Sequence, residues 1–532
     1  SQYKSAKQKR CIFRMPGTFF GLEIARRGLQ TQRIAMDVTG HNVANANTPG
    51  YTRQEAVIAA TDPYANPTLG GRLLPGQLGT GVEATMVRRI KNEYLDVQAR
   101  DSISSREYWQ VQEEVFGRIE AVFPEPGASG IADILTKFFN TWHDLNNTPQ
   151  DPGVKAAVAE TGDELATMMR EAYQQLDDIS KSILEVDPSG NVTGGQLKDQ
   201  VDAVNEILRQ IRELTGSIKR VYAQGNQPND LLDKRDLLLD RLAEYGPVSV
   251  TLLTDGGRPT GEIALTFFGV DVGSADVAVE LKPVIGQSSG KVEEVKLQIG
   301  SDQVSLTNYQ KNLPKAGSLV GLEETRANVD GYTYTDQNGT KTTVKGYKDK
   351  LENLAGALKD TIDQALNYGH DTDPGTPNPD KIDFFTGSLA GRDFTVNPEI
   401  MKDPTLIDGT NALYVARLAT VGMDGTQGFV LGKDASGNQV TVDLANLGGA
   451  TFNEYFNALL ADIGARSGSA SDMAKSQSAV TEQVESLRQS VSGVNLDEEL
   501  SRLIQYQYGY QASARVLTTI DEMLDYLINR TG

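Results

Sequence analysis

The chain has 532 residues and a mass of 57.7 kDa, which is enough for about three or four globular domains. Its 51 Lys and Arg against 71 Asp and Glu leave a formal charge of −20, which argues against binding to nucleic acid or to anionic lipid. No stretch approaches about 18 apolar residues without a charge, which excludes a membrane span.

The side chains that usually do chemistry are scarce. Cys11 is the single cysteine, so an intramolecular disulfide framework and a cysteine-cluster metal site are excluded. His41, His143 and His370 lie far apart, without the helical spacing of a zinc hydrolase motif. We therefore expect no cofactor, no metal site and no enzyme activity.

Residues 1–14 are basic and precede a change of composition at Met15. We interpret them as an upstream extension. The alternative, a secretory signal, lacks the apolar core and the small-residue cleavage site that such signals need.

Residues 19–45 are predicted to form a helix with a heptad seam. The seam residues recur every seven positions: Leu22, Leu29, Met36 and Val43. The segment from Asn45 to Tyr51, with Pro49 and Gly50, should end this helix. Residues 63–81 are rich in Gly and Pro and are expected to form a loop or short strands.

Apolar residues at steps of three and four predict long helices over 108–122, 131–145, 158–183, 197–222 and 229–242. Asn229 is expected to cap the last of these, and Gly246-Pro247 to end it. The β-branched segments 248–254, 262–272 and 292–300 predict a small β domain. Helices are expected again near Leu319 and over 347–368, then a loop over 371–380 and mixed strand and loop over 384–450.

Helices resume at Phe452, and the last one is predicted to start at Asn495 with a capping-box-like pair to Glu498. Its first heptad series is Leu496, Leu503, Tyr510, Leu517 and Leu524. A second series, Tyr506, Ile520 and Leu527, is interrupted by Ser513. Leu500, Ile504, Val516 and Ile528 lie off the main seam and widen the apolar face.

The predicted fold is mainly α with an inserted β domain, multidomain and nested: paired terminal heptad helices, a long-helix trunk and a small β domain at the tip. The expected parts are the extension 1–14, a coiled-coil-like terminal domain (15–62 with 491–532), a trunk (63–246, 318–399 and 451–490) and a β domain (247–317), with 400–450 unassigned. The heptad seams of the terminal helices are consistent with two interpretations. Either these helices pack on the trunk of the same chain, or they are loose in the single chain and become ordered on assembly.

Two motifs resemble catalytic or metal sites. Gly286-Gln287-Ser288-Ser289-Gly290 matches Gly-x-Ser-x-Gly, but a strand rather than a helix should follow it, so we expect a hairpin turn. His370 with Asp371, Asp373, Asp380 and Asp383 lacks the Glu at position twelve of a calcium-binding loop, so we expect a solvated loop.

The segment from Asn42 to Tyr51, Asn-Val-Ala-Asn-Ala-Asn-Thr-Pro-Gly-Tyr, resembles the signature of the bacterial flagellar rod, hook and hook-associated axial proteins. Thr52-Arg53-Gln54 narrows the resemblance to the hook-associated members. Matching segments are 492–499, 506–515, 229–236, and Phe384-Phe385 with Asn367 and His370. The resemblance runs from Met15 to the end, is weakest over 248–317 and 400–450, and does not include residues 1–14.

This resemblance implies an extracellular structural protein that joins hook to filament by helical self-assembly through its terminal helices. It implies as partners the hook protein, neighbouring copies, the second junction protein or filament, and an export chaperone at the C-terminal region. It also implies export by the flagellar type III apparatus.

The expected assembly interface combines the helix seams with the signature segment. It comprises Leu22, Leu29, Met36, Asn42, Val43, Asn45, Asn47, Thr48, Pro49, Gly50, Leu496, Leu503, Tyr506, Tyr510, Leu517, Ile520, Leu524 and Leu527. The alternatives are another axial protein (hook, rod or second junction protein), or a secreted enzyme or adhesin with its activity in the middle region.

Overall fold

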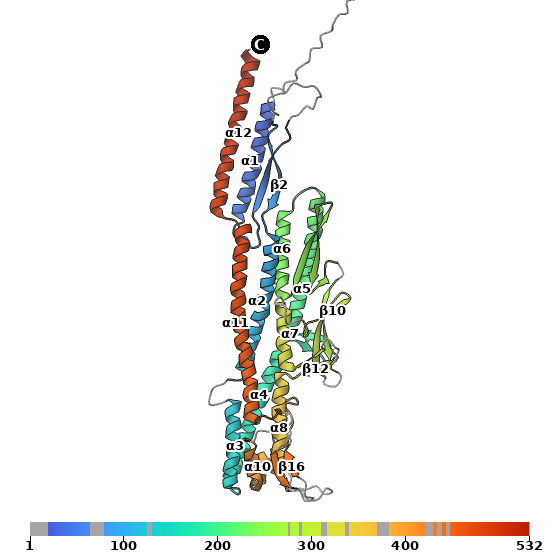
Figure 1. Cartoon of the computed structure of the whole chain (residues 1–532), viewed down its shortest axis with the longest axis vertical. Coiled ribbons are helices and arrows are strands. Elements are labelled where there is room, and N and C mark those ends of the chain that lie inside the picture. Colours follow the sequence, from blue (N-terminus) through green and yellow to red (C-terminus); the bar gives the residue numbers. More distant parts are fainter. Residues whose placement is uncertain are drawn as a thin grey trace, which may run out of the picture.

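The computed structural model describes residues 20–63, 79–124, 130–274, 277–286, 290–309, 316–335, 340–369, 382–420, 429–433, 439–442 and 447–530. The molecule is a long rod, with the first and last helices side by side at one end (Figure 1). Within these ranges, none of the helices combines the length and the apolar character needed to cross a bilayer.

The terminal end is built from two helices and a two-stranded sheet. Helix α1 (Phe20–Ala44) runs antiparallel to α12 (Leu496–Arg530). Strands β1 (Gln54–Ala60) and β2 (Val82–Arg89) form an antiparallel pair that packs on α1. The Thr31 hydroxyl donates to the Val82 carbonyl at 3.2 Å, so α1 contacts both α12 and this sheet.

Long helices make up the trunk. They are α2 (Glu93–Ala121), α3 (Ile131–Asn147), α4 (Pro152–Ile183), α5 (Gln196–Ala223), α6 (Asn229–Tyr245), α7 (Gly317–Asp330), α8 (Tyr347–Leu366) and α11 (Phe452–Ser492). Side chains cap several of their N-termini: Asn92 begins α2, Asp151 begins α4, and Thr451 forms a capping box with Glu454 on α11.

Short elements connect these helices. The antiparallel strand pairs are β3 (Glu185–Val186) with β4 (Val192–Gly194), β11 (Tyr332–Thr335) with β12 (Lys341–Val344), β13 (Phe385–Thr386) with β14 (Thr395–Val396), and β15 (Phe429–Lys433) with β16 (Gln439–Val442). The short helices are α9 (Pro398–Lys402), α10 (Ala412–Arg417) and the 3-10 turns η1 (Pro404–Leu406) and η2 (Gly409–Asn411).

Two three-stranded antiparallel sheets form the inserted β region. One contains β5 (Val248–Asp255), β6 (Arg258–Phe267) and β7 (Val270–Asp271), and the other β8 (Val279–Ile285), β9 (Val292–Ile299) and β10 (Asp302–Ser305). The mainly-α class with inserted β is confirmed, but the expected position at the tip needs correction. Both sheets lie along the side of the trunk, and α3, α10 and β16 occupy the far end (Figure 1).

Apolar burial explains this side-on position. Phe267 of β6 and Leu297 of β9 are fully buried in the same core as Leu208 of α5. A strand with one apolar face is most stable when that face covers a helix. The long apolar stripe of α5 therefore holds the sheets against the trunk.

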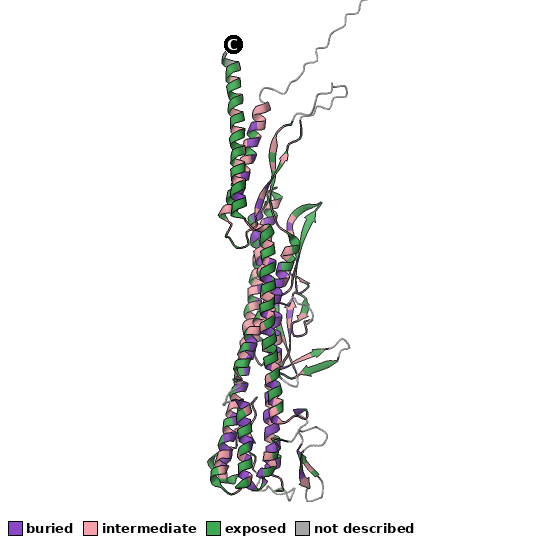
Figure 2. Ribbon diagram, turned by 60° about the vertical axis from the view of Figure 1, so that its left-hand side comes forward, coloured by how far each residue is buried: buried purple, intermediate pink, exposed green. Residues whose placement is uncertain are grey.

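The main hydrophobic core runs through the trunk and ends before the terminal helices. All of its fully buried members lie between Val115 and Ala470. Figure 2 shows buried residues gathered in the trunk and a largely exposed α12. The terminal end is therefore attached to the trunk by something other than this shared apolar core.

The structure tests the two side chains that were predicted to cap helices α12 and α6. Asn495 caps α12, since its side chain accepts from the backbone N–H groups of Asp497 and Glu498. The expectation that Asn229 caps α6 is wrong. Its amide instead donates to the Gln54 side chain and the Val87 carbonyl, both at 3.0 Å, and so binds the terminal sheet.

Candidate functional site: the joint between terminal helices and trunk

Helices α1 and α12 approach closely through small residues. A β-carbon on Gly28 would lie 2.9 Å from the Ser513 hydroxyl oxygen, and one on Gly21 would lie 3.1 Å from Ile520. One heptad along α1 therefore matches one heptad back along α12. Ser513, expected to interrupt the seam, sits where the helix backbones are nearest, because a larger side chain would not fit beside Gly28.

The predicted seam of α1 lies one position away from this line of closest approach. Half-buried positions on the flanks of the contact are Leu22, Leu29, Met36 and Val43 on α1, and Leu503, Tyr506, Leu517, Ile520 and Leu524 on α12. Leu496 and Tyr510 are exposed. The side chain of Leu527 lies outside the described residues. In the signature segment Asn42 is buried, Asn45 is half-buried, and Asn47, Thr48, Pro49 and Gly50 are exposed.

The side chain of Asn42 connects several segments of the terminal domain by hydrogen bonds. Its amide nitrogen donates to the Gln54 carbonyl and to the Glu499 carboxylate, both at 2.8 Å. Its amide oxygen accepts from the Tyr51 hydroxyl at 2.8 Å and from the Gln54 backbone N–H at 2.9 Å. All four hydrogen-bonding positions of this buried side chain are used, so α1, β1 and α12 meet at one residue.

Glu499 brings a fully buried carboxylate to the same point. Besides the bond from Asn42, it lies 4.0 Å from Arg53 and 3.6 Å from Arg502. Glu498, its neighbour, binds Arg53 at 3.2 Å instead of closing the predicted capping box. The Arg53 backbone N–H also donates to the Ser492 carbonyl at 2.8 Å, at the break between α11 and α12.

Three carboxylates on one face of α6 bind residues of the terminal domain and of the adjacent helices. We call these three residues the α6 ladder: Asp233, Asp236 and Asp240. Their spacing of three and four residues places them on one side of the helix. Arg89, at the end of β2, bridges the first two through Nη1, at 2.8 Å from Asp233 and 2.7 Å from Asp236.

Further donors complete the α6 ladder. Asp233 accepts from the Thr52 backbone N–H at 3.0 Å, and Asp236 binds Lys91 at 3.0 Å. Asp240 accepts from Arg100 on α2 at 2.9 Å and from Arg488 on α11 at 2.6 Å. The α6 ladder therefore connects four separate segments of the chain.

Burial and neighbouring charges act in opposite directions on these carboxyl groups. Burial raises the pKa of Asp233, although Arg89 opposes it. Burial also acts to raise the pKa of Asp236, but Lys91 and Arg89 outweigh it and hold that pKa at about 2. Burial, with the nearby carboxylates, raises the pKa of Tyr51. Asp236 thus stays ionised at neutral pH, and its ion pairs persist.

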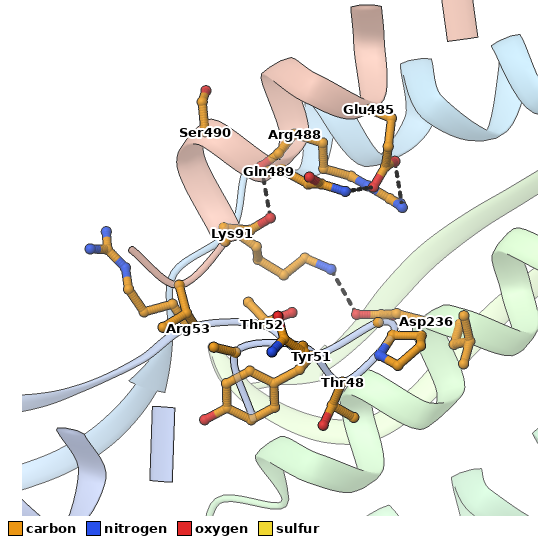
Figure 3. Close-up of a pocket in the computed structure, with 18 of the residues that line it drawn as sticks. Thr48, Tyr51, Thr52, Arg53, Lys91, Asp236, Glu485, Arg488, Gln489 and Ser490 are labelled. Carbon is orange, nitrogen blue, oxygen red and sulfur yellow. Dashed lines mark hydrogen bonds and ion pairs between the residues drawn. The ribbon is translucent and has the colours of Figure 1, made fainter. Parts of the chain in front are cut away.

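The signature segment forms the turn between α1 and β1 and closes over an open pocket of about 830 Å³. Gly50 has a φ of +75°, and a β-carbon there would lie 3.2 Å from Leu237, so glycine meets two requirements at once. Figure 3 shows Lys91 reaching Asp236 beneath the end of α11, with Thr48 and Tyr51 on the opposite side. The pocket separates the signature segment from the end of α11.

The motifs that resemble catalytic sites gain no support here. Strands β8 and β9 flank the Gly-x-Ser-x-Gly motif as an antiparallel pair, as the hairpin prediction requires, although residues 287–289 lie outside the described part. The Asp-rich segment at 370–381 is likewise outside it. Across the described ranges, no group of three or more His, Cys, Asp or Glu is arranged to hold a metal ion.

Sequence reasoning missed several residues of this site: Arg53, Gln54, Arg89, Lys91, Asp233, Asp236, Asp240, Arg488 and Glu499. The spacing of the three ladder carboxylates on a predicted helix was the available signal. Their partners come from segments up to 248 residues away, and spacing within one helix does not identify such partners.

Both ends of the chain match family models of flagellar axial proteins. Residues 22–52 match the model described as "Flagella basal body rod protein", and residues 488–530 match "Flagellar basal body rod FlgEFG protein C-terminal". Residues 116–385, about half of the chain, match "Flagellar hook-associated protein FlgK helical domain". The class is therefore that of the flagellar axial proteins, and the chain belongs to the FlgK family of hook-associated proteins.

Relatives named "Flagellar hook-associated protein 1" are similar to this chain over almost their whole length. The Bacillus subtilis (strain 168) protein is 28% identical over 527 residues, covering 97% of this chain and 99% of its own. The Escherichia coli (strain K12) protein is 26% identical over 563 residues, covering 95% and 98%.

The solved structure of the flagellar hook junction protein FlgK from Burkholderia pseudomallei is 14% identical, with a TM-score of 0.47, and the match covers 74% of this chain and all of that one. The family matches make this chain a structural protein of the flagellum with a role at the hook–filament junction, where it assembles with other flagellar components.

Proposed function

We propose that this chain joins hook to filament by packing α1 and α12 against neighbouring subunits in a helical lattice. The observation that carries the proposal is the outward face of α12. Leu500, Ile504, Val516 and Met523 are 47–55% exposed, although the opposite face of the same helix packs on α1. Such a helix lowers its free energy by covering this face with further helices.

The partners we propose are the hook protein on one side, neighbouring copies around the ring, and the second junction protein or filament on the other. An export chaperone would cover the C-terminal region before assembly, and the flagellar type III apparatus would export the chain. The exposed apolar face of α12 supports this proposal, because such a surface would otherwise promote aggregation before assembly. We propose that the chain acts mechanically and catalyses no reaction.

The proposed interface is the set predicted from the sequence, with the exposed face of α12 as its main contact surface. Half-buried members of that set, such as Leu517, hold α12 on α1 and so shape the surface. Exposed members such as Leu496 are free to contact a neighbouring subunit directly.

Co-sedimentation with isolated hooks stripped of filament, followed by electron microscopy, tests this function. The chain from Met15 is compared with one lacking 15–50 and 496–532. We expect only the chain that keeps both terminal segments at the distal end of the hooks. Binding by both forms would show that the trunk makes the contact. Binding by neither would favour another axial role, and self-polymerisation into hook-like tubes would favour a hook subunit.

A further inference from the structure

The terminal domain and the trunk meet at a joint that lies outside the main apolar core. The main core ends within the trunk, and the pocket of about 830 Å³ leaves open space between the signature segment and the end of α11. The bond between the Arg53 N–H and the Ser492 carbonyl connects the terminal domain to the end of α11. A single hydrogen bond acts as a pivot, since it permits rotation about itself.

Helix α6 constrains this rotation through Asn229 at its start and through the α6 ladder. Asp233 and Asp240 are two turns apart on α6, a separation of about 10 Å at 1.5 Å per residue. The first binds the terminal domain through Thr52 and Arg89, and the last binds Arg488 at the end of α11. Because Asp240 holds α6 to α11 within the trunk, Asp233 attaches the terminal domain to the trunk at a place away from the Arg53–Ser492 bond. Two separated attachments resist a rotation that one attachment permits.

Arg89 has the central position in this arrangement. Its guanidinium bridges Asp233 and Asp236, and its side chain is 12% exposed, so water screens the interaction little. Asn42 ties α1, β1 and α12 together, so a constraint on the end of β2 is passed to the terminal helices as a group.

We propose that Arg89, bridging Asp233 and Asp236, is the positioning residue that sets the angle between the terminal domain and the trunk. Without the bridge the hydrogen bonds of Thr52 and Asn229 remain, but they hold the angle less tightly, so the terminal domain rotates about Arg53 and Ser492 toward the space of the pocket. This extends the proposed function, because subunits in one lattice must present their terminal helices at one angle. The angle itself is nevertheless a property of the single chain.

The test measures a distance between two spin labels on the isolated full-length chain. One label is placed by Gln30→Cys on the exposed side of α1 and the other by Arg241→Cys on α6, with Cys11→Ser removing the native thiol. We expect one narrow distance distribution for this parent. Arg89→Gln should abolish this narrow distribution and give a broad or shifted one. Arg89→Lys, which keeps the charge on a shorter side chain, should give an intermediate result.

Arg209→Gln is the matched control. Arg209 also bridges two carboxylates, Glu206 and Glu213, but on the exposed face of α5 away from the joint. It should leave the distribution unchanged. An unchanged narrow distribution in Arg89→Gln would overturn the proposal.

The double variant Asp233→Asn, Asp236→Asn decides the matter if Arg89→Gln fails to fold, because it keeps Arg89 and removes only the charges that it bridges. It should broaden the distribution like Arg89→Gln, and a narrow one would overturn the proposal. Hook co-sedimentation is measured separately. Failure of the parent chain to bind hooks would count against the proposed function and leave the distance result standing.

Discussion

The side-chain amide of Asn42 donates to the carboxylate of Glu499 at 2.8 Å, joining positions 457 residues apart. Both groups are buried, and the same amide is bonded to the backbone of Gln54 on both of its edges. The first helix, the first strand and the last helix therefore depend on one another. Disturbing one is expected to loosen all three.

Asn42→Ala tests this dependence. The substitution leaves the Gln54 N–H, the Tyr51 hydroxyl and the Glu499 carboxylate without their partner, at about 1–3 kcal/mol for each group that stays buried. We expect faster hydrogen exchange throughout α12 and β1, with the trunk helices unchanged. Asn47→Ala, in the same signature segment but exposed, is the matched control and should leave exchange unaffected. Equal exchange in the two variants would contradict the role of Asn42.

Gly28→Ala tests the close approach of the two terminal helices. A β-carbon would lie 2.9 Å from the Ser513 hydroxyl oxygen, so either this hydroxyl turns away or α12 shifts, and overpacking of this kind costs about 1–3 kcal/mol. We expect a lower stability of the α1–α12 pair, measured by exchange or limited proteolysis, and partial recovery on adding Ser513→Gly.

Gly40→Ala on the same helix is the control, because a β-carbon there meets nothing within 4 Å. Helix propensity predicts that it stabilises α1 by up to about 1 kcal/mol. If Gly28→Ala were equally stabilising, α1 and α12 would not approach each other closely at Gly28 and Ser513.

Ile504→Asp separates assembly from folding. Ile504 is about half exposed in the single chain, so the expected change in the free energy of unfolding is within about 0.5 kcal/mol. In the proposed lattice the new carboxylate would be buried without a partner, so binding to hook ends should be lost. Circular dichroism and co-sedimentation measure the two effects. Full binding by the folded variant would place the interface elsewhere.

Leu517→Asp differs from the previous change because Leu517 is half-buried and lies between Ser513 and Ile520, the positions of α12 that approach α1. It should both weaken the α1–α12 pair and abolish assembly. The thermal transition of the trunk should persist, since Leu517 lies outside the main core. Loss of the trunk transition would refute the separation of roles between trunk and terminal helices.

Asp363 gives a pH dependence to the trunk. Burial raises its pKa, the Phe384 N–H at 2.6 Å opposes this, Asp383 adds to it, and the result is about 7. An unfolded Asp titrates near about 3.9. Between these values the folded state keeps a proton that the unfolded state has lost, so this group's stabilisation is complete below about pH 4 and is lost as the pH rises through 7.

Asp363→Asn should remove that dependence. Relative to the parent, the variant should gain stability between pH 5 and pH 8, with a slope approaching about 1.4 kcal/mol per pH unit below 7. Urea unfolding at several pH values measures it. Asp178→Asn, an exposed carboxylate on α4, should show no such trend. A difference between parent and Asp363→Asn that stays constant with pH would exclude Asp363 as the source.

Much of the local structure follows from the sequence because periodicity and capping act over a few residues. The three- and four-residue steps from Leu197 to Tyr222 predict α5, and Asn495 predicts the start of α12. The terminal heptads predict two helices that seek apolar partners. These features depend on the hydrogen bonds and the apolar face of one segment, which its own residues determine.

Tertiary structure alone decided how the segments meet. The sequence predicts Asn229 as a helix cap, but in the structure its side chain binds residues of β1 and β2 instead. Ser513 interrupts the predicted heptad series, but in the structure it faces Gly28, where the two helices are closest. The carboxylates of the α6 ladder bind Arg89, which lies 144 residues from Asp233 in the sequence. Hydrogen bonds and ion pairs act over about 3 Å. Which distant residues come that close is determined by the packing of the whole chain, and the pattern of one segment does not contain it.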